Sequence, residues 1–206
     1  LFPVREGTTP LKFMPEYEEW LVNAMKEGGN TAFWKQNNIR DYTENYKDIP
    51  VYLVGGWYDS WGVNTTENYM ALSKTIKGPV YMIMGPWIHG QQGNYSHGQV
   101  SFGNDAAIPD LLAWRMEWYD HWIKNEKTAV GNEDPFKTNV RIFVMGTGDG
   151  HMTEDSLLTH GGYWRNENEW PLERTQYPPY YFHANGSVSA EKPITNLGLK
   201  ELCFDT

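Results

Sequence analysis

The sequence is short of basic residues, of cysteine and of long apolar runs. It contains 17 lysine and arginine residues against 26 aspartate and glutamate residues, which gives a formal net charge of −9. Because no basic surplus is available to displace counterions from phosphates, we expect no nucleic-acid partner. The one cysteine, Cys203, cannot form an internal disulfide or a thiolate metal site, and we expect neither a metal nor a cofactor. No apolar run reaches the length of a membrane span and the mean hydropathy is −0.63, so we expect a soluble chain without a membrane partner.

Aromatic residues are what the sequence has in excess. They make up 15% of the 206 residues, and disordered chains lack such residues, so we expect a folded protein. The length fits one large domain or two smaller ones. The first residue is Leu1, and no signal-peptide pattern follows it. We therefore expect a piece of a longer protein, and we leave its compartment open between the cytoplasm, the periplasm and secretion.

Helical spacing and strand-like runs alternate in the first half of the chain. Residues 15–28 predict a helix, because proline and glutamates open the segment and a glycine pair closes it. A short helix is expected near 31–37. Residues 50–55 and 80–84 are β-branched runs of the buried-strand type, and residues 65–76 between them have a helix-compatible composition. This order predicts a βαβ unit with two parallel strands.

The second half of the chain begins with a predicted loop and a predicted helix. Residues 90–104 are polar and rich in glycine, which is typical of a loop. Residues 106–124 predict a helix that covers the sheet. We expect its buried face to contain Ile108, Leu111, Leu112, Met116, Tyr119, Trp122 and Ile123, with Glu117, Asp120 and Lys124 on the opposite face.

The pattern changes after residue 125. Residues 139–145 alternate as a strand, and short aromatic runs separated by proline, glycine and asparagine follow. Helical periodicity disappears. This part of the sequence predicts the start of an antiparallel β-sandwich or jelly roll, with a domain boundary near 125–138.

Two short motifs follow the predicted parallel strands. Gly-Gly-Trp-Tyr-Asp occupies residues 55–59, and Gly-Pro-Trp-Ile-His occupies residues 85–89. Functional groups of open α/β sheets gather beyond the carboxyl ends of parallel strands, and neighbouring strands lie about 4.8 Å apart. Asp59 and His89 are therefore expected to meet. A carboxylate that holds the Nδ1–H of an imidazole leaves Nε2 free to take a proton from a nucleophile.

These motifs resemble the acid and base motifs of the CocE/NonD serine hydrolases. That group includes cocaine esterase, the α-amino acid ester hydrolases, the cephalosporin acylases and the X-prolyl dipeptidyl peptidases. The resemblance continues, in the family's order, through residues 118–122, 140–146, 164–165 and 169–171.

The resemblance implies an α/β-hydrolase sheet, a helical cap and a carboxy-terminal jelly roll. Residues 1–47 would be the end of the cap, 48–130 the carboxy-terminal part of the α/β-hydrolase domain, and 131–206 the start of the jelly roll. Asp59 would be the triad acid and His89 the general base, and Trp61 matches a position where the family places an aromatic ring against the substrate acyl group. The substrate would be a small ester, an amide or a short peptide.

The family's G-x-S-x-G motif is missing from these residues. The nucleophilic serine and the oxyanion-hole donors are therefore expected upstream of Leu1, and the isolated chain is expected to be inactive. Without upstream strands, the strand at 50–55 would have an unpaired edge. We expect either a homo-oligomer formed through such exposed edges or a rearrangement of the exposed edge.

Other interpretations of these residues stay open. Asp59 could be an ordinary turn or N-cap residue ahead of the helix at 65–76, and His89 could be a satisfied loop histidine. For the whole chain, the alternative to a hydrolase is an aromatic-rich β-sandwich module that binds carbohydrate by stacking.

Overall fold

The computed structural model describes residues 4–124, 136–183 and 185–193. Cys203 lies outside the described residues. The chain divides into two compact units, Leu1–Trp170 and Pro171–Thr206. In the described ranges, no helix is both long enough and apolar enough to cross a membrane.

Short helical segments open the first unit. They are η1 (Pro10–Phe13), α1 (Pro15–Lys26), α2 (Ala32–Lys35) and η2 (Ile39–Asn45). The helix predicted at 15–28 is confirmed as α1, which begins at the predicted proline and ends two residues before the glycine pair. The short helix predicted near 31–37 is confirmed as α2.

The predicted βαβ unit is confirmed. Strand β1 (Val51–Gly56) is followed by helix α3 (Gly62–Thr75) and strand β2 (Val80–Gly85). The two strands are parallel, and their register runs from Val51 opposite Val80 to Gly56 opposite Gly85. The strands therefore end side by side.

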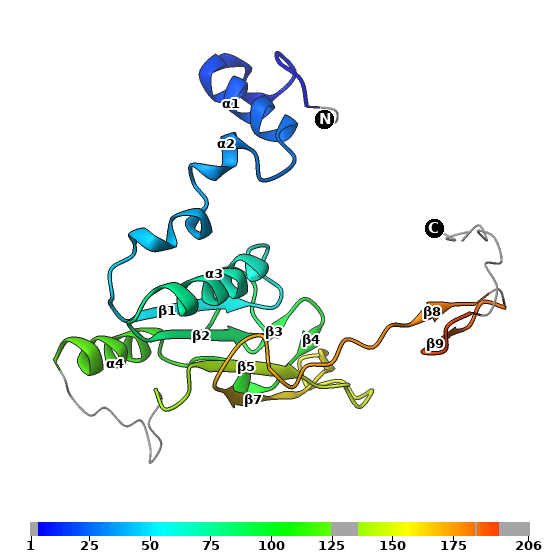
Figure 1. Cartoon of the computed structure of the whole chain (residues 1–206). Coiled ribbons are helices and arrows are strands. Elements are labelled where there is room, and N and C mark those ends of the chain that lie inside the picture. The colour runs from blue at the N-terminus through cyan, green and yellow to red at the C-terminus, as the bar shows by residue number, and fades with distance from the viewer. Residues whose placement is uncertain (1–3, 125–135, 184, 194–206) are drawn as a thin grey trace. The chain divides into compact units, whose positions relative to one another are not determined.

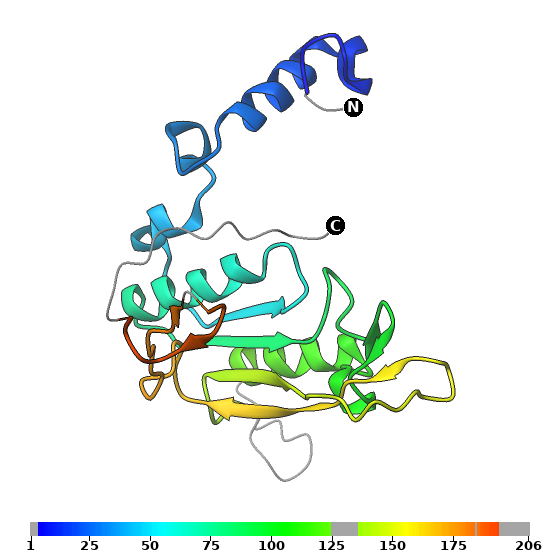
Figure 2. The same cartoon turned by 90° about the vertical axis from the view of Figure 1, so that its right-hand side faces the viewer.

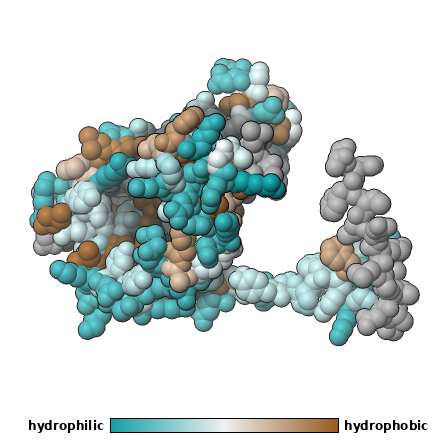
Figure 3. Space-filling view, turned by 90° about the horizontal axis from the view of Figure 1, so that it is seen from above, coloured by the Kyte–Doolittle hydropathy of each residue, from teal (hydrophilic) through white to brown (hydrophobic). Residues whose placement is uncertain are grey.

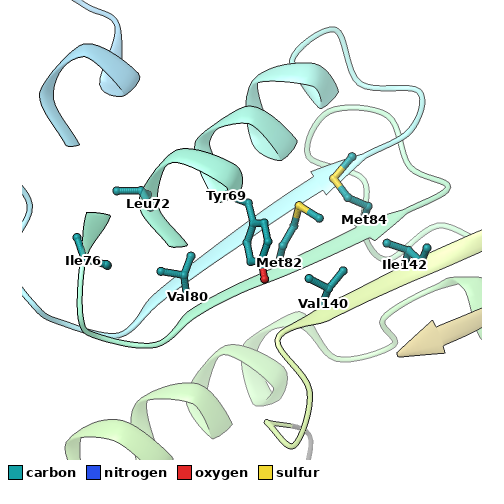
Figure 4. Packing of buried hydrophobic residues seen from close by; sticks show 8 residues of the cluster. All are labelled: Tyr69, Leu72, Ile76, Val80, Met82, Met84, Val140 and Ile142. Atoms are coloured by element: carbon teal, nitrogen blue, oxygen red, sulfur yellow. The ribbon is translucent and has the colours of Figure 1, made fainter. Parts of the chain in front are cut away.

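Helix α3 and one face of the sheet enclose the main core (Figure 4). Its buried members are Tyr69, Leu72, Ile76, Val80, Met82, Met84, Val140 and Ile142. All six residues of β2 are buried, so this strand is covered on both faces. That explains why its sequence is continuously apolar rather than alternating.

Helix α4 (Leu111–Ile123) covers the other face of the sheet, as Figures 1 and 2 show. The ring of Tyr52 on β1 lies 5.3 Å from that of Trp114 and 5.0 Å from that of Trp118. These large rings, which recur at helical spacing, set which side of α4 is turned toward the sheet.

The buried face predicted for this helix is only partly correct, because Trp122 packs on Tyr81 of the sheet with ring centroids 6.2 Å apart but four other members are exposed. Leu112, Met116, Tyr119 and Ile123 are 70%, 43%, 51% and 74% exposed. Glu117, which was expected on the solvent side, is buried. The tryptophans of the helix occupy the space against the sheet, whereas Tyr119 and the aliphatic residues named above point outward.

Two further strands extend the same sheet. Strand β5 (Val140–Met145) pairs in parallel with β2, and β7 (Gly162–Glu167) pairs antiparallel with β5, so the order is β1-β2-β5-β7. We expected residues 139–145 to open a separate β-sandwich. The segment joins the α/β sheet instead, because β5 satisfies the outer edge of β2 and buries Val140, Ile142 and Phe143 on the two faces. The proposed domain boundaries stay a prediction.

Small elements occupy the loops. The predicted loop at 90–104 contains β3 (Ser96–His97) and β4 (Val100–Ser101), which pair antiparallel, and η3 (Asn104–Ala106) begins at its end. Strand β6 (Leu158–Thr159) pairs with β4. This loop is therefore tied to residues almost sixty positions later, which its composition did not indicate.

The second unit contains one small antiparallel pair among its described residues, β8 (Tyr181–Phe182) with β9 (Val188–Ser189). The jelly roll stays a prediction. On the face drawn in Figure 3, hydrophobic and hydrophilic residues are intermixed over the larger unit. Many large apolar side chains of this protein are exposed.

Candidate active site

The candidate site lies where β1 and β2 end. The chain beyond both strands stays hydrogen-bonded, because the Trp57 N–H donates to the Gly85 carbonyl at 2.9 Å and the Tyr58 N–H donates to the Trp87 carbonyl at 3.1 Å. The residues that follow each strand therefore remain adjacent. This pairing positions Asp59 against His89.

Glycines allow this close approach. A Cβ on Gly56 would collide with the backbone carbonyl of Trp87, and a Cβ on Gly85 would collide with the Trp87 indole. Trp87 itself is fully buried, and its Nε1–H donates to the carbonyl of Ala106 at 2.8 Å. The strand ends need glycine because no side chain fits between the two segments.

Asp59 and His89 are in direct contact, as the sequence predicted. His89 Nδ1 lies 3.0 Å from Asp59 Oδ2. The Asp59 side chain is only 11% exposed, whereas that of His89 is 73% exposed. Within the described ranges no hydrogen bond is formed by His89 Nε2. The carboxylate therefore holds one imidazole nitrogen while the other faces solvent.

The second oxygen of Asp59 serves the local turn. Asp59 Oδ1 accepts a hydrogen bond from the Trp61 N–H at 2.9 Å, just before α3 begins at Gly62. Asp59 can therefore stabilise the turn and pair with His89 at the same time, because each interaction uses a different carboxylate oxygen. The turn fixes the orientation in which the carboxylate meets the imidazole.

Trp61 lies beside the imidazole. Its ring centroid is 4.7 Å from that of His89, with the ring planes 68° apart, and the residue is 56% exposed. The family resemblance implies that Trp61 lies against the substrate acyl group. The structure brings it to the accessible side of the site, and its contact with a substrate stays a prediction.

Neither a nucleophile nor a metal cluster accompanies the pair in the described part of the chain. No serine hydroxyl there is hydrogen-bonded to His89, and no group of three or more histidine, cysteine, aspartate or glutamate residues is arranged to hold a metal. The arrangement present is thus a base with its orienting carboxylate.

Indole hydrogen bonds that the sequence analysis missed support the site. Trp57 Nε1–H donates to the Phe143 carbonyl at 2.9 Å, and Trp164 Nε1–H donates to the Asp105 carbonyl at 2.7 Å. The available signal for Trp57 and Trp87 was their position within two residues of the strand-ending glycines Gly56 and Gly85, since a buried indole N–H needs an acceptor.

Beneath the site, Tyr58 packs on Phe102 with ring centroids 5.6 Å apart, and His97 packs on the same phenyl ring at 6.2 Å. Burial lowers the pKa of His97. Its Nε2 is buried and has no hydrogen-bond partner within the described residues. The sequence offered no indication that His97 would pack on the same ring as Tyr58.

Comparison with known proteins shows which family the chain resembles. Residues 3–91, which include both motifs, match the X-Pro dipeptidyl-peptidase (S15) family. The resemblance of the sequence to the CocE/NonD group is confirmed by this match and by cocaine esterase from Rhodococcus sp. (strain MB1 Bresler), which is 25% identical over 142 residues. That alignment covers 68% of this chain and 21% of the esterase.

A solved structure supports the fold of this chain. The crystal structure of an aminopeptidase from the marine sediment archaeon Thaumarchaeota archaeon superposes with a TM-score of 0.56 at 19% identity, covering 87% of this chain and 27% of the aminopeptidase. The chain thus spans about a fifth to a quarter of the length of these two proteins. The mixed α/β fold is confirmed, and the relatives found are hydrolases. A carbohydrate-binding module is not favoured by any of these matches.

Proposed function

We propose that this chain supplies the acid and base of a serine hydrolase that transfers acyl groups to water. The observation that carries the proposal is the 3.0 Å contact between Asp59 and His89 at the ends of adjacent parallel strands. Asp59 is nearly buried and held by the Trp61 N–H, while His89 is open to solvent. This is the geometry that general-base catalysis requires, because the base is oriented on one side and accessible on the other.

In the proposed mechanism, His89 Nε2 removes the proton from a serine hydroxyl as its oxygen attacks the substrate carbonyl carbon. The Asp59 carboxylate holds the Nδ1–H and stabilises the imidazolium that forms. His89 then returns the proton to the leaving alcohol or amine, which departs as the acyl-enzyme forms. Water, deprotonated by the same nitrogen, releases the carboxylic acid and restores the serine.

The proposed substrates are small esters, amides or short peptides, as the family relationship suggests. Trp61 is proposed to contact the acyl group, because its exposed ring flanks the imidazole that faces the reacting carbonyl. An aromatic surface next to the base favours an apolar acyl group.

The serine is proposed to come from outside these 206 residues, since no G-x-S-x-G occurs in them. We therefore expect no turnover from the isolated chain and no labelling of it by a fluorophosphonate probe. Stoichiometric labelling of one of its serines would contradict this part of the proposal.

The orienting contact can be tested on the chain itself by NMR of its histidine nitrogens. With Asp59 intact, neutral His89 should carry its proton on Nδ1; in an Asp59→Ala variant it should move toward the Nε2–H form that predominates in free imidazole side chains. Asp149→Ala, at another aspartate that contacts a histidine, is the matched control and should leave His89 unchanged. An unaltered His89 spectrum in Asp59→Ala would refute the pairing.

Activity is tested in an enzyme that contains this chain together with its nucleophile. There, His89→Ala should lower kcat by about three orders of magnitude or more, because the base is lost. The exposed His151→Ala is the control and should keep kcat within about twofold. An unchanged kcat in His89→Ala would overturn the assignment.

We also propose that the isolated chain self-associates through β1, with a second copy as the occupant. Strand β1 stands at the end of the sheet order, and no described residue pairs with its outer edge. Its sequence, Val-Tyr-Leu-Val-Gly-Gly, contains no charge and no proline to discourage pairing, and Val54 is 37% exposed. Such an edge is a template for an identical strand related by a twofold axis.

A further inference from the structure

A cleft beside the start of α4 is not used by the proposed chemistry. Two adjacent hollows, of about 190 and 520 Å³, share the lining residues Asp105, Ala107, Pro109, Arg141 and Trp164. The smaller hollow is completed by apolar residues that include Ile108 and Trp114, and the larger one by residues that include Asn104 and Tyr163. The cleft therefore has an apolar inner part and a more polar mouth.

Arg141 is the cation of this cleft. Its guanidinium lies over the Trp164 ring, 4.8 Å from the ring centroid, and the residue is exposed. Over the described ranges, no acceptor is hydrogen-bonded to Arg141 and no carboxylate forms an ion pair with it. A cation–π contact of this kind uses none of the guanidinium N–H donors, so they stay available to a ligand.

The platform beneath Arg141 is rigid. The Trp164 indole donates to the Asp105 carbonyl at 2.7 Å, and its ring lies 5.3 Å from Phe143 and 5.5 Å from Trp87. Because Trp164 is held from these sides, little conformational entropy is lost when a ligand binds to the guanidinium above it. Such preorganisation favours binding at a single cation.

Acidic groups limit what this cleft accepts. Asp105 lines the cleft. A second carboxylate, Glu117, also acts in this region, because the charges of both Glu117 and Arg141 affect the pKa of the buried Tyr52. Burial raises the pKa of Tyr52, and the Arg141 charge opposes that rise while the Glu117 charge adds to it. With one unpaired arginine and carboxylates nearby, a singly charged anion is favoured over a phosphate, whose higher charge would need more cations.

We propose that this cleft binds a small organic monocarboxylate with a flat apolar body. The carboxylate accepts hydrogen bonds from the Arg141 guanidinium, and the apolar body lies against Pro109 and Trp114 in the inner part. A volume of a few hundred Å³ with a single cation among its lining residues is the character of a small-molecule site for an anion. The inference requires neither Asp59 nor His89, so it stands independently of the proposed hydrolase function.

The test is isothermal titration calorimetry of the full chain with 4-phenylbutyrate, and with 4-phenylbutanamide as the uncharged counterpart. We expect saturable binding of the carboxylate and at least about tenfold weaker binding of the amide, because the amide lacks the charge that Arg141 recognises. Absence of binding by the carboxylate, or equal binding of both compounds, would overturn the proposal.

Variants locate the binding. Arg141→Gln should weaken the carboxylate about tenfold or more, and Arg141→Lys should bind with intermediate affinity because it keeps the charge without the planar donors. Lys12→Gln is the matched control, since Lys12 also lies over an aromatic ring, Phe13 at 5.0 Å, but lines neither hollow. Asp105→Asn should strengthen binding by removing a nearby negative charge.

A folding control accompanies these measurements. Circular dichroism should be unchanged in Arg141→Gln, because the residue is exposed. If Arg141→Gln lost its fold, the location of binding would be tested in the unaltered chain instead. A ligand in the cleft must shift the NMR resonance of the Trp164 indole Nε1–H, because Trp164 lines the cleft. A saturating ligand that leaves this resonance in place would contradict the location.

Discussion

The missing Cβ of Gly56 keeps the strand ends, and with them Asp59 and His89, close enough to touch. The Trp87 carbonyl occupies the space where that Cβ would lie, and this carbonyl also accepts the Tyr58 N–H. Any side chain at Gly56 must push the Trp87 segment away. Because Trp87 is fully buried, the segment has little room to yield.

We therefore expect Gly56→Ala to lower the free energy of unfolding by about 1–3 kcal/mol, the usual cost of overpacking. Gly28→Ala is the control, because no atom lies within 4 Å of the position of its Cβ and its backbone is not left-handed. Urea unfolding followed by circular dichroism measures both variants. Equal stability of the two would show that the strand ends relax freely.

His97 makes stability depend on pH. Burial lowers its pKa in the folded chain, whereas the unfolded chain binds the proton near the ordinary value of about 6.5. Above that value neither state is protonated at this site, and the contribution to stability is complete. As the pH falls below it the unfolded state binds more protons, so the contribution is progressively lost down to the folded pKa.

We expect the His97→Gln variant to lose less stability than the unaltered chain between pH 8 and pH 5.5. The exposed His151→Gln is the control and should lose as much as the unaltered chain. The urea midpoints at the two pH values give the comparison. If His97→Gln is as sensitive to pH as its parent, the buried imidazole is not the titrating group.

At the scale of the element, α4 shows where sequence periodicity is insufficient. Its end and its position over the sheet follow from the sequence, but its rotation and its start do not, because the helix begins at Leu111 rather than near residue 106. The helix contains tryptophans and aliphatic residues on different sides, and hydrophobicity alone does not determine which of these two sets is buried against the sheet. The choice depends on which set fits the rings of Tyr52 and Tyr81, and that is known only after the sheet is assembled.

The rotation of α4 predicts that substitutions on its two faces change the free energy of unfolding by different amounts. Leu112→Lys should change the free energy of unfolding by less than about 0.5 kcal/mol, because Leu112 is exposed. Trp118→Ala should cost about 2 kcal/mol or more, because its ring packs on Tyr52, Tyr81 and Trp122. Urea unfolding at concentrations where the chain is monomeric measures both. The reverse order of effects would mean that the aliphatic stripe faces the sheet.

At the scale of the whole molecule, parallel strands and the Asp59–His89 contact could be predicted because they depend on local patterns. Two glycine-ended runs separated by one helix are enough to bring two strand ends together. The position of β5 could not be predicted in this way. Its alternating sequence suits either a sandwich or the edge of a parallel sheet, and the pairing of Met82 with Val140 joins residues far apart in the chain.

The free edge of β1 bears on the oligomeric state of the isolated chain. We expect the isolated chain to self-associate, and Val54→Lys to shift it toward the monomer, because a lysine on an edge strand discourages pairing. Val63→Lys is the control, since Val63 is 67% exposed but lies on α3. Light scattering coupled to size-exclusion chromatography distinguishes the species. A monomer at high concentration for the unaltered chain would exclude pairing through β1.

The hydrogen bond from the Trp57 indole to the Phe143 carbonyl also bears on the order in which the molecule folds. It joins residues 86 positions apart, whereas Asp59 and His89 are separated by 30. Closing a longer loop costs more entropy, so contacts between nearby segments form earlier. The carboxylate and the imidazole are therefore expected to meet first, within a β1–α3–β2 intermediate, and the Trp57 bond to close when β5 arrives and completes the refolding reaction.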